Sequence, residues 1–258
     1  TTDSSGCSSG YVWSGSPLSV NAFDDKGNHS GNADCNYTSS FNGTSSAAPM
    51  VSGVVALMLD ANPSLTWRDV KHLLATTARQ LEVNRPAIML NETIVEPAWT
   101  QNSAGYVFHN SYGFGAIDAE AAVTAAATYD SDSLGTYFVT REVSSEQLSL
   151  SFDGLSEAED TLSISENGTV ESVRIKLFAS HTNPSNLSIA LVSPSGTRSV
   201  LLTPLNAYLR WDTSDYVELS TNAFYGEFIQ GDWRLEVEDH LSGDGGVLNR
   251  WSIKVYGH

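Results

Sequence analysis

Residues 41–49 read Phe-Asn-Gly-Thr-Ser-Ser-Ala-Ala-Pro, and the run Met-Val-Ser-Gly-Val-Val-Ala-Leu-Met-Leu follows at 50–59. The second run is apolar almost all the way round, so a helix over these residues is expected to be buried in a core. The first run supplies a glycine turn into that helix, with Ser45 at the junction. The free N–H groups and the positive dipole end of a helix favour negative charge there. A serine in this place can attack a carbonyl carbon and have the resulting oxyanion stabilised.

A simpler interpretation exists for Ser45. Gly-Thr-Ser at a helix start often serves only as an N-cap, because Ser and Thr satisfy free backbone donors. The small residues Gly43, Ala47 and Ala48 would instead let a substrate backbone approach closely. Pro49 is expected in the first turn of the helix, where its missing N–H costs little. For an arbitrary Gly-Thr-Ser sequence the cap is the favoured interpretation.

The composition limits the possible partners. The chain has 258 residues, of which 41% are hydrophobic, enough for two domains with a sizeable core. It carries 30 acidic and 13 basic residues, a net charge of −17, which argues against nucleic acid as a partner. No apolar run reaches the roughly 20 residues that span a bilayer. The chain opens on Thr1 without an initiator Met, so we interpret it as a processed or cut piece of a longer protein.

The two cysteines, Cys7 and Cys35, flank a segment rich in Gly, Ser and Asn. A disulfide between them would limit the freedom of this loop in the unfolded chain and stabilise the fold by about 3 kcal/mol. An even number of cysteines fits an oxidising compartment, so we expect a secreted, extracellular or periplasmic protein. Two unpaired thiols are the less favoured alternative, because neither cysteine lies in an apolar run.

The pattern of the remaining chain changes near residue 128. Thr66 and Asp69 form a capping-box pattern before an expected helix at 67–79, and a Gly-rich turn at 112–118 leads into an Ala-rich helix at 119–127. Residues 81–105 are expected to be irregular. The polar segment 128–137 is interpreted as a linker.

Beyond the linker, apolar and polar residues alternate with a period of two, and turn residues separate the runs. This pattern predicts a β-sandwich with one polar side on each sheet. The strands are expected around Leu148–Phe152, Val173–Leu177, Leu187–Leu191, Val200–Leu202, Trp233–Val237 and Trp251–Val255. Aromatic residues at the inward positions are interpreted as core.

These segments together resemble a known family. The run at 42–49 closely resembles the serine motif of the subtilisin-like proteases, the subtilases. Residues 65–70 (Leu-Thr-Trp-Arg-Asp-Val) and 109–115 (His-Asn-Ser-Tyr-Gly-Phe-Gly) look like the last helices of the kexin/furin-type branch. A further resemblance, to the jelly-roll P domain of that branch, is found at residues 191–199, 231–237 and 255–257. The resemblance implies the C-terminal part of an α/β subtilisin-like domain over 1–127, a linker over 128–137 and a P domain over 138–258.

The resemblance also implies a mechanism of acyl transfer on a polypeptide substrate. Ser45 would be the nucleophile, with Asn42, Gly43 and Thr44 lining the substrate site. A subtilase triad runs Asp, His, Ser along the chain, and this chain has no His-Gly-Thr sequence before Ser45. The triad Asp and His and the oxyanion Asn are therefore expected on an upstream segment of the same precursor. The alternative is a catalytically inert fragment that acts as a binding or stabilising module.

Calcium is usual in this branch, so the resemblance implies a calcium cofactor. Oxygen donors in this chain could come from Asp239, Asp244 and the pair Asp130 and Asp132. Solvated turns are the favoured interpretation for these four residues. His72 and His109 are interpreted as ordinary surface or packing histidines.

Overall fold

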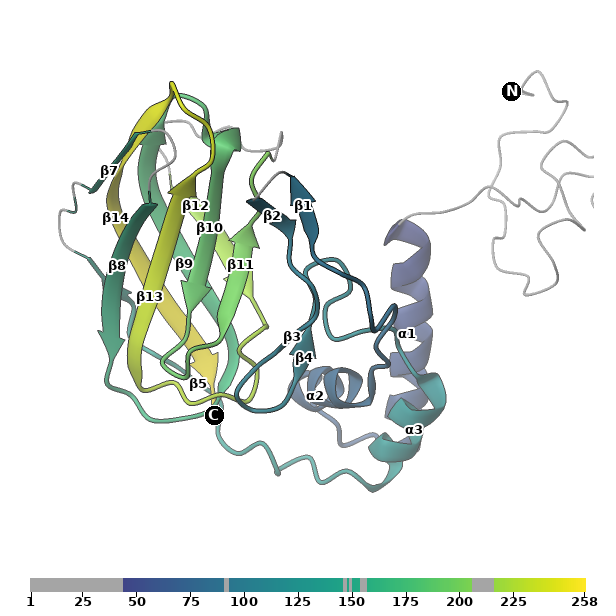
Figure 1. Cartoon of the computed structure of the whole chain (residues 1–258). Helices are drawn as coiled ribbons and strands as arrows, with labels where there is room; N and C mark the ends of the chain where they lie inside the picture. Colours follow the sequence, from purple (N-terminus) through teal and green to yellow (C-terminus); the bar gives the residue numbers. More distant parts are fainter. Residues whose placement is uncertain (1–43, 91–92, 146–147, 149, 154–156, 206–215) are drawn as a thin grey trace, which may run out of the picture. The chain divides into compact units, whose positions relative to one another are not determined.

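The computed structural model describes residues 44–90, 93–145, 148, 150–153, 157–205 and 216–258 (Figure 1). The chain divides into two units, residues 1–63 and 64–258, and each is treated separately below. The predictions for Cys7, Cys35, Asn42 and Gly43 concern residues that the structure does not describe. The predicted domain boundaries, 1–127, 128–137 and 138–258, remain a prediction.

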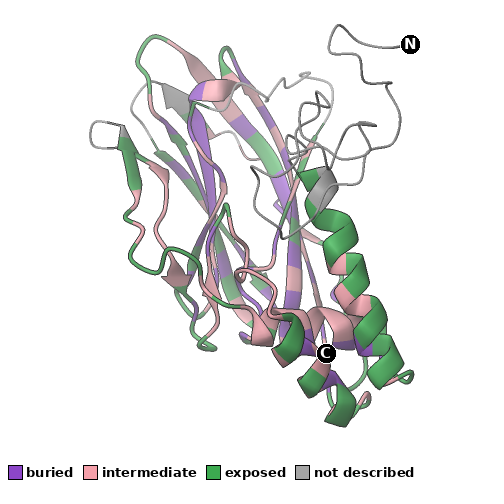
Figure 2. Cartoon of the chain, turned by 90° about the vertical axis from the view of Figure 1, so that its right-hand side faces the viewer, coloured by how far each residue is buried: buried purple, intermediate pink, exposed green. Residues whose placement is uncertain are grey.

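The helix expected after the glycine turn is present, and it begins at Thr44. α1 covers Thr44–Ala61. Together with the next two residues, up to Pro63, it makes up the described part of the first unit. The prediction that this helix is buried is wrong. Figure 2 shows α1 largely in the colour of exposed residues, Met50 is 74% exposed and Leu57 is 56% exposed. An apolar sequence can be buried only where other protein covers it, and most of α1 has no such cover in the part of the chain described here.

The second unit begins with helical structure, as predicted. Helix α2, Trp67–Thr77, starts at a capping box. The backbone N–H of Asp69 donates to the Thr66 side-chain oxygen, and the Asp69 carboxylate accepts from the backbone N–H of Thr66. Helix α3, Ala119–Thr128, is capped by Asp118, whose carboxylate accepts from the Ala121 N–H at 3.0 Å. None of the described helices is long and apolar enough to cross a membrane.

The segment expected to be irregular contains one small antiparallel pair and the first strand of a second. β1 (Ile88–Leu90) pairs with β2 (Thr93–Glu96), and β3 (Thr100–Gln101) pairs with β4 (Val107–Phe108). The prediction for residues 81–105 is therefore wrong in part. Strands of two to four residues are too short to show a period-two pattern, so they could not be predicted from hydrophobic periodicity.

The rest of the second unit is a sandwich of two antiparallel sheets, which confirms the predicted all-β architecture (Figure 1). One sheet has the strand order β11-β10-β13-β8, and the other has the order β12-β9-β14-β5, with β6 and β7 also paired to β14. The strands are β5 Phe138–Val139, β6 Val143–Ser144, β7 Leu150–Asp153, β8 Glu157–Ile164, β9 Val170–His181, β10 Leu187–Val192, β11 Arg198–Leu202, β12 Val217–Thr221, β13 Gly231–Asp239 and β14 Gly245–Gly257.

The core of the sandwich comes from the inward positions of the alternating strands. Trp233 and Trp251 are both fully buried, and the Trp233 ring meets Phe224 edge-on at 5.1 Å between centroids. The Trp233 ring nitrogen donates to the carbonyl of Ile229 at 2.9 Å, so its one polar group is satisfied inside the core. The aromatic residues are core, as predicted.

Candidate active site

The candidate nucleophile lies in the first turn of α1. Thr44 is the first helical residue and is exposed, and Ser45 follows it. The first turn contains no acidic residue, so no carboxylate there offsets the positive end of the helix dipole. The side chain of Ser45 lies outside what the structure describes. The role of Ser45 therefore stays a prediction, as do the substrate contacts of Asn42, Gly43 and Thr44.

Pro49 does not lie where the sequence predicted. It is inside α1, at the sixth residue, and not in the first turn. Proline has no N–H, so it cannot donate to the carbonyl oxygen four residues earlier, which belongs to Ser45. The main-chain oxygen of Ser45 therefore lacks its usual helical donor.

Within the second unit, α2 is attached to the sandwich by a buried ion pair. The guanidinium of Arg68 donates from Nε to Glu171 Oε1 at 3.0 Å and from Nη2 to the same oxygen at 2.5 Å. His258 Nδ1 lies 2.9 Å from this oxygen, and Lys71 Nζ donates to the Glu171 carbonyl at 2.8 Å. Burial raises the pKa of the Glu171 carboxyl, but the hydrogen bonds from Arg68 and His258 outweigh it and hold the pKa below its usual value. Glu171 is therefore a charged anchor between α2 and β9.

His72 packs against the sandwich in the same region. Its Nδ1 lies 2.9 Å from the hydroxyl of Tyr225, and the two rings are tilted with centroids 6.0 Å apart. Burial lowers the pKa of His72, and burial also raises the pKa of Tyr225 well above its usual value. Both groups are thus kept neutral, which confirms the packing interpretation of His72.

A second attachment joins the β3–β4 hairpin to the loop before β13. The Asn102 side chain is buried and donates to the carbonyls of Ala223 and Tyr225 at 2.9 and 2.8 Å. The Ser103 N–H donates to Glu227 Oε1 at 2.9 Å, and the Thr197 hydroxyl donates to the same oxygen. Sequence patterns did not single out Asn102, Glu171 or Glu227, because a polar residue at a junction between segments leaves no periodic signal.

His109 is buried, as a packing histidine should be. Its ring stacks on Tyr112 at 4.9 Å between centroids and lies 5.2 Å from the ring of Trp99. The Ser111 N–H donates to His109 Nδ1 at 3.1 Å, and Glu96 Oε1 lies 3.6 Å from that nitrogen. This ring is held by its own hairpin and turn, which confirms the packing interpretation.

The predicted oxygen donors for calcium fit a cation poorly. Asp239 is buried, not in a solvated turn, and its two oxygens meet His181 Nε2 and the Leu241 N–H, each at 3.2 Å. The oxygens of Asp244 accept from Thr182 at 3.0 Å and Asn186 at 2.9 Å. Both carboxylates already have protein partners. Asp130 and Asp132 are exposed in the turn after α3.

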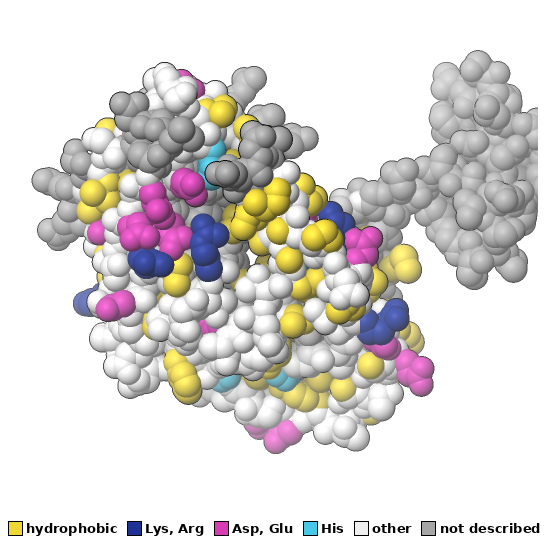
Figure 3. All heavy atoms as spheres, in the orientation of Figure 1, with side chains coloured by type: hydrophobic (Ala, Val, Ile, Leu, Met, Phe, Trp, Pro, Cys, Tyr) yellow, Lys and Arg dark blue, Asp and Glu magenta, His cyan; other side chains and the backbone are white. Residues whose placement is uncertain are grey.

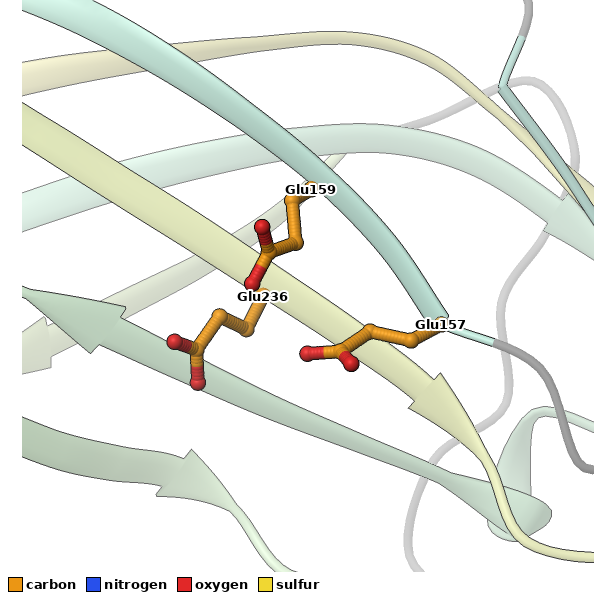
Figure 4. Close-up of side chains that lie close together, drawn as sticks. All are labelled: Glu157, Glu159 and Glu236. Carbon is orange, nitrogen blue, oxygen red and sulfur yellow. The ribbon is translucent and has the colours of Figure 1, made fainter.

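One group of carboxylates in the described part of the chain lies close enough together to hold a metal ion. Glu157 and Glu159 of β8 and Glu236 of β13 point toward one another (Figure 4), with ligand atoms within 4.8 Å. Burial and the neighbouring carboxylates raise the pKa of Glu157. Arg198 Nε and Arg234 Nη2 donate to Glu236 at 2.6 and 2.8 Å. Two guanidinium groups on the most buried member make this cluster a poor site for a cation.

Comparisons with known proteins follow the same division of the chain. Residues 7–115 match the subtilase family, and residues 170–255 match the proprotein convertase P-domain. An extracellular serine protease of Aeromonas sobria is 33% identical over an alignment 304 residues long, which covers all of this chain and 48% of that protein. Proprotein convertase subtilisin/kexin type 5 of Homo sapiens is 33% identical over 85% of this chain and 12% of its own length.

A solved structure agrees with these matches. The crystal structure of the serine protease of Aeromonas sobria superposes with a TM-score of 0.80 at 31% sequence identity, covering 90% of this chain and 47% of that one. A complex of the same protease with the chaperone ORF2 gives a TM-score of 0.79. The chain spans about half the length of the Aeromonas relatives it matches. The chain thus looks like the C-terminal part of a subtilase joined to a proprotein convertase P domain, and the resemblance predicted from the sequence is confirmed.

Proposed function

We propose that this chain supplies the nucleophile of a kexin-like serine endopeptidase. The observation that supports this is the place of Ser45, in the first turn of a helix that begins at Thr44, inside the stretch that matches the subtilase family. In this mechanism Ser45 attacks the scissile carbonyl, an upstream His takes its proton, and an upstream Asp orients that His. The Ser45 N–H and an upstream Asn amide hold the oxyanion. Asn42, Gly43 and Thr44 line the substrate site.

The upstream parts come, in this proposal, from a preceding segment of the same precursor. Such a segment would cover the apolar faces of α1, where Met50 and Leu57 are exposed. Burying one such side chain stabilises a complex by about 1.5–3 kcal/mol, so several together are enough for tight association. In this proposal the protein is secreted or periplasmic, because its Aeromonas sobria relative is named an extracellular serine protease. Calcium, which the family resemblance implies, is bound in this proposal largely by the upstream segment, because Asp239 and Asp244 already have protein partners.

Two measurements test this proposal. A fluorophosphonate probe should label Ser45 in the protein that includes the upstream segment and should not label the Ser45→Ala variant. In a peptidase assay the same variant should lose about six orders of magnitude in kcat, the size of loss known when the nucleophile of subtilisin is removed. An unlabelled Ser45 in the complete protein would favour the inert module instead, and retained activity in Ser45→Ala would refute the nucleophile.

A further inference from the structure

The sequence contains several acceptor motifs for N-linked glycans that the proposed function does not use. Each motif has the form Asn-x-Ser/Thr, where x is not Pro. A glycan is bulky and hydrophilic, so the folded protein can carry one only on an Asn that stays at the surface. The motifs begin at Asn28, Asn36, Asn42, Asn91, Asn167 and Asn186, and the structure describes the last two in full.

Asn167 lies in the turn between β8 and β9. The residue is exposed, and its side chain has no hydrogen-bond partner among the residues that the structure describes. The nearby Ser163 and Ser165 are exposed as well. The amide group of Asn167 is therefore available at the surface for a new covalent bond.

Main-chain hydrogen bonds hold this turn in place. The N–H of Thr169, the third residue of the motif, donates to the His258 carbonyl at 2.7 Å, and the His258 N–H donates back at 3.1 Å. The Gly168 carbonyl accepts from the Ile229 N–H at 3.0 Å. None of these bonds uses the side chain of Asn167, so a glycan on it would leave the turn intact.

Asn186 carries the same motif in a different environment and serves as an internal contrast. It is 2% exposed, and its Nδ2 donates to Asp244 Oδ2 at 2.9 Å. Nδ2 is the atom to which an N-linked glycan is attached. A glycan on Asn186 would displace this hydrogen bond and would need space inside packed protein, so the folded chain cannot carry it.

The motif at Asn91 joins β1 to β2, and Asn91 itself is not among the described residues. Three large apolar side chains of the two flanking strands are exposed, those of Ile88, Met89 and Ile94. Figure 3 shows hydrophobic side chains gathered over these strands, and such a surface commonly marks a contact with other protein. The β8–β9 turn, residues 165–169, has no large apolar side chain and suits a hydrophilic glycan better.

We propose that Asn167 is an acceptor site for an N-linked glycan and that Asn186 is not. The donor is an oligosaccharide carried on a lipid pyrophosphate, and a transferase of the secretory compartment recognises the motif. A bond forms between Asn167 Nδ2 and the anomeric carbon of the sugar, and the bond from that carbon to the phosphate oxygen breaks. The lipid pyrophosphate leaves, and Nδ2 gives up one proton. The inference rests on the secretion proposed above and needs no contribution from Ser45.

Secretion of the full chain from a glycosylating eukaryotic host, behind an added secretion signal, tests this site. The chain carries Ser45→Ala, so that the result is independent of peptidase activity. Trypsin cleaves after Arg174 and Lys176, which places Asn167 and Asn186 on different peptides. Peptide-N-glycosidase in heavy-oxygen water converts each glycosylated Asn to labelled Asp, and mass spectrometry then reads each site. Occupancy at Asn167 should exceed that at Asn186 by at least about fivefold in the secreted, folded protein.

Two variants of one residue separate the motif from the fold. Thr169→Ser keeps the motif and should keep the label at Asn167, whereas Thr169→Ala breaks the motif and should lose it. Both variants make a small change to the same half-buried side chain. Melting temperatures within a few degrees of the parent show that each variant is folded.

Several outcomes would overturn this proposal. One is an unlabelled Asn167 in a host that glycosylates a secreted reference protein. Another is a label on Asn167 that persists in Thr169→Ala. A label on Asn186 in protein that melts at the parental temperature would refute the contrast between the two motifs. Loss of peptidase activity or failure of the fluorophosphonate label, by comparison, would count against the proposed function alone.

Discussion

The Arg68–Glu171 pair offers the sharpest test of how α2 is held to the sandwich. Arg68→Ala removes both bonds to a carboxylate that is 2% exposed, and it also removes the bond from Nη1 to the Gly135 carbonyl at 2.9 Å. Among the described residues, His258 would then be the one side chain left with a hydrogen bond to this carboxylate. Breaking a buried pair by removing one partner costs about 3–5 kcal/mol. For a chain of this size the melting temperature should fall by roughly 6–20 °C.

The assay is urea and thermal unfolding of the full chain, with Arg174→Ala as the matched control. Arg174 pairs with Glu218 at 3.0 Å, but both side chains are well exposed, so this variant should lose only about 0–1 kcal/mol. A double variant, Arg68→Ala with Glu171→Ala, should be more stable than Arg68→Ala alone, because no unpaired carboxylate is left. Equal losses in Arg68→Ala and Arg174→Ala, or a double variant no better than the single one, would refute the reasoning.

The Arg68–Glu171 pair should also affect how the free energy of unfolding depends on pH. The hydrogen bonds of Arg68 and His258 hold the pKa of Glu171 below its usual value, so the carboxylate contributes stability above its unfolded pKa. That contribution is lost as the pH falls through the lowered folded pKa. In Arg68→Ala, burial is no longer offset by the guanidinium, and the pKa rises. The variant should therefore lose less stability than the parent as the pH falls through the acidic range, because Glu171 no longer contributes stability that protonation removes.

Three further predictions concern single residues of the second unit. The pKa of His72 is lowered by burial, so folding stability should decline as the pH falls below about 6.5, and His72→Gln, which can still bond Tyr225, should flatten that decline in urea titrations from pH 8 to pH 5. Gly115→Ala should destabilise the chain by more than about 2 kcal/mol beyond Gly105→Ala, because both have positive φ but only the Cβ at 115 would meet a backbone carbonyl oxygen, at 2.3 Å. Trp233→Ala should cost about 3–5 kcal/mol, measured by urea unfolding, because the ring is fully buried.

The sandwich could be predicted from the sequence because buried and exposed residues alternate along its strands. In β9, residues such as Val173, Ile175 and Leu177 are buried while Arg174 points outward, so the pattern in the sequence is the pattern in the sheet. The capping box at Thr66 was equally visible, because it depends on two side chains at a fixed spacing. Capping residues and the regular alternation of burial therefore predict most of this fold from the sequence.

The contacts that join the segments could not be predicted in this way. Glu171 is one residue of a strand, and nothing in its neighbours shows that Arg68, about 100 residues earlier, will bond it. Asn102 and Glu227 depend in the same way on loops that meet only after folding. The β1–β2 hairpin was missed because its strands have three and four residues and expose most of their large side chains.

The one large error of sequence reasoning, the burial of α1, follows from what a hydrophobic pattern can report. A helix that is apolar on every face shows that the folded protein must cover it, but the pattern does not say which residues provide the cover. Here Met50 and Leu57 remain exposed, and the matched relatives are about twice as long as this chain. Leaving several such side chains in water costs about as much as the entire stability of a small domain. The apolar sequence of α1 is therefore best explained by contact with protein outside the described residues, and in the proposed function the base for Ser45 also comes from outside them.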